Sequence, residues 1–376
     1  MRVMHVISGL RNGGAEAILY RLVTFDEQDE HLVVSMMNDE YYGARLRARG
    51  IEVVELGMPP GALTRPGVNA FRRLLREREP DVVQCWMYHA DLIGGALARL
   101  AGRRRVFWGL HHTTLDPEQT TRTIRLLARL CALASWTVPT RIVSCSEEGV
   151  DVHARLGYRR SRFVVVPNGY DIAEFAPSPE RREAARARLG VPDGTFLFGM
   201  VGRWHEQKDH ENLLKALERL RAVRPSGWRC AMVGPGIDEA NATLRESRAR
   251  KGLDDLVELL GPTDDVPSLM NALDLHVLPS AFGEAFPNVV AEAMACGTPC
   301  VVTDVGDAAL MVGDTGRVVP PRSPDALAAA LAEMIEERDA AGEAWAERRS
   351  RCVQRVRSRF SLERMVAAYR DVWSAP

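Results

Sequence analysis

Short apolar runs alternate with longer segments of helical spacing along almost the whole chain, and this alternation most limits the fold. The first series of expected strands comprises residues 3–8, 32–36, 52–55, 82–85, 106–110, 141–145 and 163–166. The second series comprises residues 196–201, 229–233, 257–260, 275–278, 300–303 and 316–318. Strands that are apolar throughout and alternate with helices, such as those expected at 16–23, 69–76 and 210–221, predict parallel sheets covered on both faces.

The alternation breaks once, after a Pro-Asn-Gly turn at residues 167–169. A polar stretch rich in arginine, glutamate and proline follows before the second series begins. We therefore predict an α/β protein with two doubly wound, Rossmann-like domains, residues 1–170 and 190–359, joined by a linker at 171–189. Because open α/β sheets bind ligands beyond the carboxyl ends of their strands, the two domains are expected to face a central cleft.

Composition excludes several classes of protein. The 49 lysines and arginines balance 50 acidic residues among 376 residues, so no global positive field favours nucleic acid. Seven cysteines without a C-x-x-C pair are typical of buried thiols in a reducing compartment rather than of disulfides or a zinc site. No run of 18 apolar residues and no signal-peptide pattern is found, which predicts a cytoplasmic protein.

Two features at expected strand ends of the first domain are candidates for ligand contact. Gly13 and Gly14 lie between the first strand and the next helix, where backbone amides can approach an anion; a tight turn without a ligand is the alternative. His111 and His112 follow the strand at 106–110 and could donate to a bound hydroxyl or exchange a proton. Surface or supporting histidines are the alternative, and no third ligand suggests a metal.

In the second domain, two cations follow the first strand. Gly202 ends that strand, and Arg203 and Lys208 lie in the loop before the next helix. Lys208 is one of only three lysines in the chain, so composition alone does not explain a lysine at this position. An arginine fork and a lysine point charge in such a loop predict a diphosphate clamp.

The segment 280–299 carries the strongest signal. Pro287 suits the first position of a helix, so that the amides of Asn288 and Val289 would be unpaired donors for an anion. Glu284 lies just before this helix and Glu292 lies within it, where a carboxylate can accept from vicinal hydroxyls. Helix-dipole complementation explains Glu284 equally well, but it explains Glu292 poorly.

Residues 99–129 hold seven arginines against two acidic residues. In the helical pattern at 120–134, three of these arginines share one face, while Ile124, Leu127, Leu130 and Ala134 fill another. Such a helix is usually packed on the core with a solvated back, but it can also lie on an anionic membrane. Both interpretations stay open.

Taken in order, these motifs resemble those of the GT-B glycosyltransferases of retaining family 4. The resemblance covers nearly the whole chain and rests on five landmarks: the Gly13-Gly14-Ala15-Glu16 loop, the strand end at 108–111, the turn at 166–171, Gly202-Arg203 with Lys208, and the E-x7-E pattern from Glu284 to Glu292. It implies an enzyme that moves a sugar from a nucleotide diphosphate sugar, with a UDP-sugar favoured. The implied acceptor is a glycan or a lipid-linked sugar of surface polysaccharide or lipopolysaccharide biosynthesis at the inner membrane face.

The resemblance also implies roles for the candidate residues. Arg203 and Lys208 would hold the donor diphosphate, Glu292 the ribose hydroxyls, and Glu284 the transferred sugar. His111 would contact the same sugar, and Gly13 and Gly14 would line the phosphate and acceptor side. The remaining donor contacts are expected from the second domain: Gly202, Pro262, Thr263, Ala285, Phe286, Pro287, Asn288 and Val289.

The absence of a D-x-D motif is consistent with a metal-independent enzyme of this kind, without a cofactor. No carboxylate is placed as a nucleophile, which favours same-face attack with retention of anomeric configuration. The resemblance further implies that a helix at 360–376 crosses back to the first domain, and that closure about the linker brings His111 against Glu284.

Three alternatives remain at this point. Another GT-B enzyme, such as a sucrose- or trehalose-type synthase or a nucleotide-sugar epimerase, shares the fold. A two-domain dinucleotide oxidoreductase needs G-x-G-x-x-G, which Gly234-Pro235-Gly236 matches only in part. A sugar-binding module without catalysis would keep the pocket but show no turnover.

Overall fold

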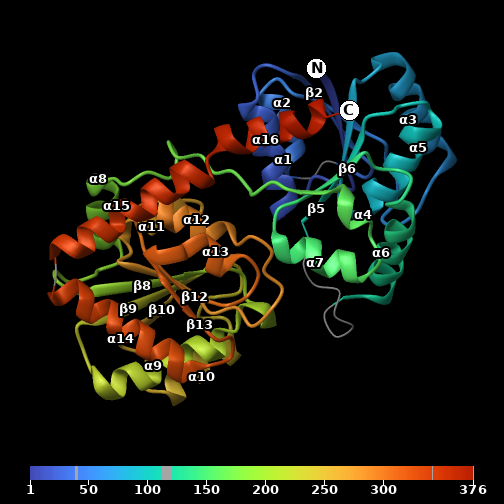
Figure 1. The fold of residues 1–376 in the computed structure, drawn as a ribbon. Coiled ribbons are helices and arrows are strands. Elements are labelled where there is room, and N and C mark those ends of the chain that lie inside the picture. The colour runs from blue at the N-terminus through green and yellow to red at the C-terminus, as the bar shows by residue number, and fades with distance from the viewer. Residues whose placement is uncertain (39–40, 112–119, 341, 376) are drawn as a thin grey trace. The chain divides into compact units, whose positions relative to one another are not determined.

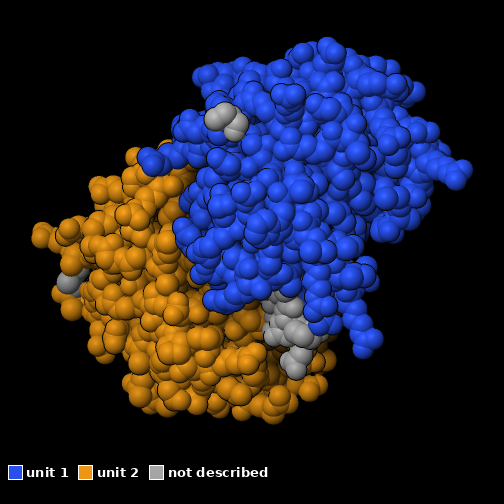
Figure 2. Space-filling view, turned by 45° about the vertical axis from the view of Figure 1, so that its right-hand side comes forward, with its two compact units in different colours: residues 1–169, 362–376 blue, residues 170–361 orange. Residues whose placement is uncertain are grey.

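A computed structural model describes residues 1–38, 41–111, 120–340 and 342–375 and divides the chain into two compact units. Unit 1 comprises Met1–Gly169 and Leu362–Pro376, and unit 2 comprises Tyr170–Ser361 (Figure 2). Each unit has its own parallel sheet and hydrophobic core. The two units are described separately below.

The sheet of unit 1 has seven strands in the order β3-β2-β1-β4-β5-β6-β7. They are β1 (Arg2–Ile7), β2 (Glu30–Ser35), β3 (Glu52–Glu55), β4 (Val82–Trp86), β5 (Val106–Leu110), β6 (Arg141–Ser144) and β7 (Phe163–Val165). All neighbouring pairs are parallel, and the strand order reverses between β1 and β4. The seven strands expected from sequence are confirmed, and their carboxyl ends share one edge of the sheet.

Helices cover both faces of this sheet (Figure 1). One face packs against α1 (Gly14–Phe25), α2 (Tyr42–Ala48) and α16 (Leu362–Ser374). The other packs against α3 (Arg65–Arg78), α5 (Gly95–Leu100) and α6 (Arg122–Ala134). The remaining helical elements of the unit are α4 (Met87–His89), the π-helix η1 (Ala90–Gly94), α7 (Glu147–Arg155) and the 3₁₀ turn η2 (Arg160–Arg162).

The last helix, α16, is an integral part of unit 1. Trp373 is fully buried and donates from Nε1 to Gln84 Oε1 at 3.0 Å, and the Tyr369 ring stacks near Trp86 with centroids 5.9 Å apart. Arg370 forms ion pairs with Asp29 at 3.0 Å and Asp26 at 3.4 Å. The helix expected at 360–376 thus begins at Leu362 and contributes apolar residues to the core that β1 and α1 share.

Unit 2 has a six-stranded parallel sheet in the order β10-β9-β8-β11-β12-β13. Its strands are β8 (Phe196–Val201), β9 (Trp228–Val233), β10 (Val257–Leu259), β11 (Leu275–Leu278), β12 (Cys300–Thr303) and β13 (Arg317–Val319). These confirm the second expected series within one or two residues. The order reverses between β8 and β11, the kind of place where doubly wound folds bind ligands.

Helices also cover both faces of the second sheet (Figure 1). One side carries α9 (His210–Val223), α10 (Ala242–Arg250) and α14 (Pro324–Ala340). The remaining helices are α8 (Pro179–Arg188), α11 (Val266–Ala272), α12 (Asn288–Ala295), α13 (Ala308–Val312) and α15 (Gly342–Arg359), with 3₁₀ turns η3 (Glu206–Lys208) and η4 (Gly313–Thr315).

The segment 171–189, expected as a linker, belongs instead to unit 2. Its helix α8 packs on α11. Arg182 donates to the Leu273 carbonyl at 2.9 Å and pairs with Asp274 at 2.6 Å, and Arg186 reaches the same carboxylate at 3.1 Å. These arginines, which in the sequence resemble a solvated stretch, attach the segment to the body of unit 2.

All seven cysteines are free and buried. Within the described part of the chain, no helix has the length and apolar character required to cross a membrane.

Candidate functional site

The loops that follow β8, β9 and β10 come into close backbone contact at the carboxyl edge of unit 2. The Gly202 amide donates to the Val233 carbonyl at 2.9 Å, and the Gly234 amide donates to the Gly261 carbonyl at 2.9 Å. A Cβ on Gly234, whose φ is +147°, would lie 2.0 Å from the Gly202 oxygen. Glycine at 234 therefore allows the approach of the two loops. Pro262 and Thr263, two of the expected donor contacts, follow Gly261 and are exposed.

Lys208 ends the turn η3 and lies across Gly202, where a Cβ would approach the Lys208 Cε to 3.3 Å. The next residue, Asp209, has a φ of +45° and caps α9 by accepting from the Asn212 amide at 3.2 Å. Lys208 Nζ donates to Glu284 Oε1 at 2.6 Å, and the two side chains are only 15% and 9% exposed. Two residues predicted separately from sequence thus form one nearly buried ion pair.

The loop that carries Glu284 is tied to the loop that carries Lys208. Ser280 Oγ donates to the same Glu284 oxygen at 2.6 Å. Gln207 Nε2 donates to the Gly283 carbonyl at 2.8 Å, and the Ala281 amide donates to the Gln207 carbonyl at 2.8 Å. A buried ion pair gives little net stability, so these bonds serve mainly to fix its position.

Gly306 lies directly against the backbone of the loop that carries Glu284. Its φ is +61°, and a Cβ there would lie 2.1 Å from the Glu284 carbonyl oxygen. The adjacent Asp307 amide donates to the Ala285 carbonyl at 3.0 Å. Sequence reasoning missed Gln207, Ser280 and Gly306, since their contacts cross long stretches of chain and leave no local pattern.

Helix α12 begins one residue later than the sequence suggested. Pro287 has an extended ψ of 105° and stands at the N-cap, and Asn288 is the first helical residue. Asn288 Oδ1 accepts from the Tyr170 hydroxyl at 2.7 Å, and the Phe286 and Tyr170 rings stack with centroids 6.4 Å apart. The start of α12 is therefore anchored to the first residue of unit 2.

Three further predicted residues, Glu292, Val289 and Arg203, differ in their exposure. Glu292 lies on α12 and is buried, as is Glu284. Val289 is half-buried, whereas Arg203 is exposed, and among the described residues no ion pair with the Arg203 guanidinium is found. An exposed guanidinium in the same β8–α9 loop as a nearly buried ammonium suits an incoming anionic ligand.

Lys208 also affects two neighbouring histidines. Burial, reinforced by the Lys208 charge, lowers the pKa of His210 to about 4 and that of His276 to about 3. Both rings are neutral at pH 7, so the positive charge at this place comes from Lys208 and not from imidazolium.

At the carboxyl edge of unit 1, Gly13 caps α1 and Gly14 is its first residue. A Cβ on Gly13 would lie 2.4 Å from Glu16 Oε2, whereas a Cβ on Gly14 would meet nothing within 4 Å, so the backbone there is open. His111 directly follows β5, and its ring stacks on the fully buried Trp86 with centroids 5.3 Å apart and planes 12° apart. His112 lies outside the described residues.

Across the ranges that the structure describes, no group of three or more His, Cys, Asp or Glu side chains is arranged so that it could hold a metal ion. Metal independence stays a prediction from the sequence.

Two family models match consecutive parts of the chain. The model described as Glycosyltransferase Family 4 matches residues 8–174, and the model described as Glycosyl transferases group 1 matches residues 195–337. The boundary between them lies close to the start of unit 2.

Curated relatives and solved structures agree with these models. The chain is 29% identical over 321 residues to the putative glycosyltransferase EpsF of Bacillus subtilis, covering 81% of this chain and 79% of EpsF. It is 26% identical over 237 residues to the UDP-Gal:alpha-D-GlcNAc-diphosphoundecaprenol alpha-1,3-galactosyltransferase of Escherichia coli, covering 62% of this chain and 60% of that protein. Anabaena Alr3699/HepE in complex with UDP-glucose superposes with a TM-score of 0.82 at 25% identity over 100% of this chain and 99% of that chain.

The close approach of Gly306 to the Glu284 carbonyl leads to a first prediction. Gly306→Ala should displace the Glu284 loop, because the new methyl group would overlap the Glu284 carbonyl. We expect at least about a hundredfold loss in turnover, since small displacements of catalytic groups have effects of that size.

Gly252→Ala is the matched control, because Gly252 has nearly the same φ, +64°, but open space around its Cα. Both variants carry the backbone strain of about 1–2 kcal/mol, measurable by thermal denaturation. Equal turnover in the two variants would contradict a role of Gly306 in positioning Glu284.

Proposed function

Because this chain belongs to the group 1 and family 4 glycosyltransferases and has the GT-B fold, we propose that it transfers a sugar from a nucleotide diphosphate sugar, with a UDP-sugar favoured, to a glycan or lipid-linked acceptor of surface polysaccharide biosynthesis. The matches to both parts of the chain make the oxidoreductase alternative wrong.

The observation that carries this proposal is the Lys208–Glu284 pair at the carboxyl edge of unit 2. Glu284 holds the ammonium in place, and an ammonium has three donors, so it can bind a diphosphate oxygen while it keeps this contact. The exposed Arg203 adds a guanidinium fork. Together the two cations would stabilise the negative charge that develops on the departing nucleoside diphosphate.

The other donor contacts follow from the loops around this pair. The amino end of α12 offers backbone amides and the positive end of its dipole to a phosphate, next to Ala285 and Phe286. We assign Glu292 to the ribose hydroxyls, Glu284 to the transferred sugar, and Pro262 and Thr263 to the border of the base. Gly202 allows the diphosphate to approach the backbone.

In unit 1, we assign His111 to the hydroxyls of the transferred sugar. The stacking on Trp86 orients its ring, which follows directly on a buried strand. Gly13 and Gly14, at the open start of α1, would line the phosphate and acceptor side.

The substrate classes are supported by the relatives. The E. coli relative is described as using UDP-Gal and a diphosphoundecaprenol-linked sugar, and Anabaena HepE binds UDP-glucose. We propose the same classes here, a UDP-sugar donor and a sugar acceptor on a lipid diphosphate, with retention of configuration and without a metal ion.

We propose that helix α6 makes a peripheral contact with an anionic membrane through an exposed apolar stripe. Three residues of its expected apolar face, Ile124, Leu127 and Ala134, pack on the core of unit 1. Leu130, expected in the core, is 43% exposed, and Leu126 and Leu133 are 59% and 74% exposed, one stripe along the helix. Trp136 continues this stripe at 55% exposed. Exposed leucines beside a tryptophan are typical of a surface that inserts at a lipid interface.

Five of the seven arginines at 99–129 fall into two groups. Arg99 and Arg105 are bound to backbone carbonyls of unit 1 and are not available to lipid headgroups. Arg104, Arg122 and Arg129 are exposed and can attract an anionic surface. A lipid-facing helix favours a lipid-linked acceptor over the soluble acceptors of a sucrose- or trehalose-type synthase.

The donor site predicts the effect of removing the Lys208 charge. Lys208→Met should lower turnover by about a hundred- to a thousandfold, the usual cost of one group that stabilises a developing oxyanion. Lys215→Met, on an exposed lysine of α9, should leave turnover unchanged. Sugar transfer or donor hydrolysis measures both. Unchanged turnover in Lys208→Met would overturn the donor-site assignment.

Stereochemistry and metal dependence can be measured together. We expect the first product anomer detected by NMR to have the configuration of the donor, because no carboxylate is placed as a nucleophile and same-face attack is therefore favoured. Activity should persist in EDTA, because Lys208 and Arg203 take the place of a divalent ion. An inverted anomer would exclude retention, and loss of activity in EDTA restored by a divalent ion would exclude metal independence.

The exposed stripe on α6 predicts membrane binding. Wild-type protein should co-sediment with vesicles of phosphatidylglycerol and phosphatidylcholine, and less so at high salt. Leu133→Glu should reduce this binding about tenfold, since it replaces an inserting side chain by an anion. Val223→Glu, a change at an equally exposed apolar position of unit 2, is the control. Equal binding of the two variants would count against α6 as the contact.

A further inference from the structure

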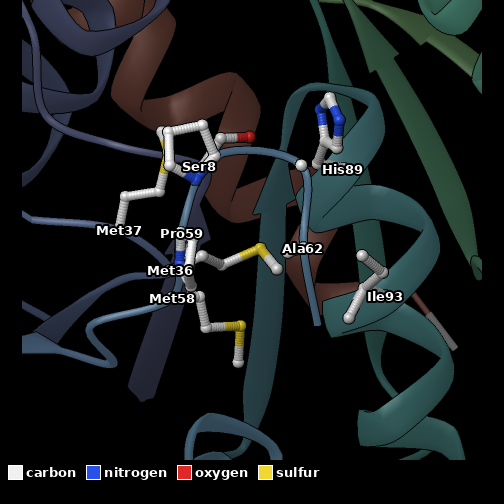
Figure 3. Close-up of a pocket in the computed structure, with 10 residues that line it drawn as sticks. Ser8, Met36, Met37, Met58, Pro59, Ala62, His89 and Ile93 are labelled. Atoms are coloured by element: carbon white, nitrogen blue, oxygen red, sulfur yellow. The ribbon is translucent and has the colours of Figure 1, made fainter. Parts of the chain in front are cut away.

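A small apolar pocket opens at the carboxyl edge of unit 1, apart from the candidate residues above. It has a volume of about 150 Å³ and is formed where β1, β2 and β3 end, opposite η1. Ser8 follows β1, Met36 and Met37 follow β2, and Met58 follows β3. Figure 3 shows these side chains across from His89 and Ile93.

Methionines provide much of the lining, and two of them, Met58 and Met37, pack closely against glycines. A Cβ on Gly67 would lie 2.5 Å from the Met58 Cε, and one on Gly9 would lie 2.8 Å from the Met37 Cε. Methionine is flexible and polarizable and suits irregular apolar ligands. The segment at 59–62 is exposed, so the pocket opens to solvent there rather than forming a closed core void.

Two polar groups accompany the apolar lining. Ser8 Oγ is buried and has no hydrogen-bond partner among the residues that the structure describes. An unpaired buried hydroxyl costs free energy unless a ligand pairs with it. Burial lowers the pKa of His89, so its ring is neutral at pH 7 and can donate one hydrogen bond and accept another.

These features define the ligand chemistry. An apolar volume of about 150 Å³ accommodates a molecule the size of benzene, roughly six carbon atoms. A ligand that fits must place an apolar group of this size among the methionines and an oxygen near Ser8 and His89. A sugar is too polar for such a lining, whereas one branched five-carbon unit with its linking oxygen matches it.

We propose that this pocket is an acceptor subsite that binds the isoprenoid unit next to the linking oxygen of a lipid-linked sugar. The inference rests on the proposed function, which places the acceptor in unit 1, and it narrows the acceptor from any glycan to one with an apolar isoprenoid group. The pocket shares its loop with Gly13 and Gly14, since only residues 9–12 separate Ser8 from them.

The test measures the binding of a ligand to the pocket and does not require turnover. The protein is labelled with ¹³C at its methionine methyl groups, and prenol, a five-carbon isoprenoid alcohol, is titrated while spectra are recorded. Prenol should shift the signals of Met36, Met37 and Met58 and saturate. Glycerol, which has the hydroxyls but no apolar group, should not shift them.

Two loop variants provide a matched comparison. Ala62 lines the pocket from an exposed position, so Ala62→Phe should fill its mouth and weaken prenol binding at least about tenfold, the lower range for a changed fit in an apolar pocket. Leu63→Phe adds a ring at the next exposed residue, which does not line the pocket, and should bind prenol normally. Ser8→Ala should weaken the binding of prenol without lowering the melting temperature, because the Ser8 hydroxyl makes no hydrogen bond to the described residues that the substitution could remove.

A separate measurement distinguishes the two proposals. UDP should raise the melting temperature of the protein, because a ligand that binds the native state stabilises it. If no nucleoside diphosphate raises the melting temperature but prenol binds, the donor assignment fails and the pocket stands. If UDP binds but prenol causes no saturable shift, or Ala62→Phe binds it as wild type does, the pocket proposal is overturned.

Discussion

Parallel strand pairing is the constraint on which the rest of the structure depends. Because every neighbouring pair in both sheets is parallel, the loops that follow the strands collect at one edge of each unit. Residues far apart in sequence, such as Lys208 and Glu284, meet there without any direct connection between them. The Met-lined pocket forms in the same way in unit 1, from the ends of three neighbouring strands and the helical turn opposite them.

Within this frame, close backbone approach sets the fine geometry. The loops after β8 and β9 meet because Gly234 has no side chain, and the Glu284 loop rests on Gly306 for the same reason. Hydrogen bonds from Gln207 and Ser280 then hold the acidic loop against the basic one. The ion pair is thereby preorganised, so that little reorganisation is required when charge develops on a leaving group.

The predictions from sequence succeeded where local pattern decides structure. Strands such as β5 are buried along their whole length, and a parallel strand buried on both faces appears in the sequence as a continuous run of apolar residues. Patterns failed where packing partners decide. On α6, Ile124, Leu127 and Ala134 of the expected apolar face pack on the core beside the buried Ala128, Cys131 and Ala132, but Leu130 stays exposed with Leu126 and Leu133. Similarly, the arginines of α8 resemble a solvated linker until Asp274, about 90 residues later, is placed beside them.

The return of the chain to unit 1 has a consequence for how the protein is made. Unit 2 is one continuous segment, whereas unit 1 needs α16, which is synthesised after all of unit 2. A nascent chain can therefore close the core of unit 2 while the face of the first sheet around Trp86 and His5 still lacks its last helix. The first sheet is thus completed only after unit 2 has been translated, and its β1–α1 face stays partly uncovered until α16 has emerged.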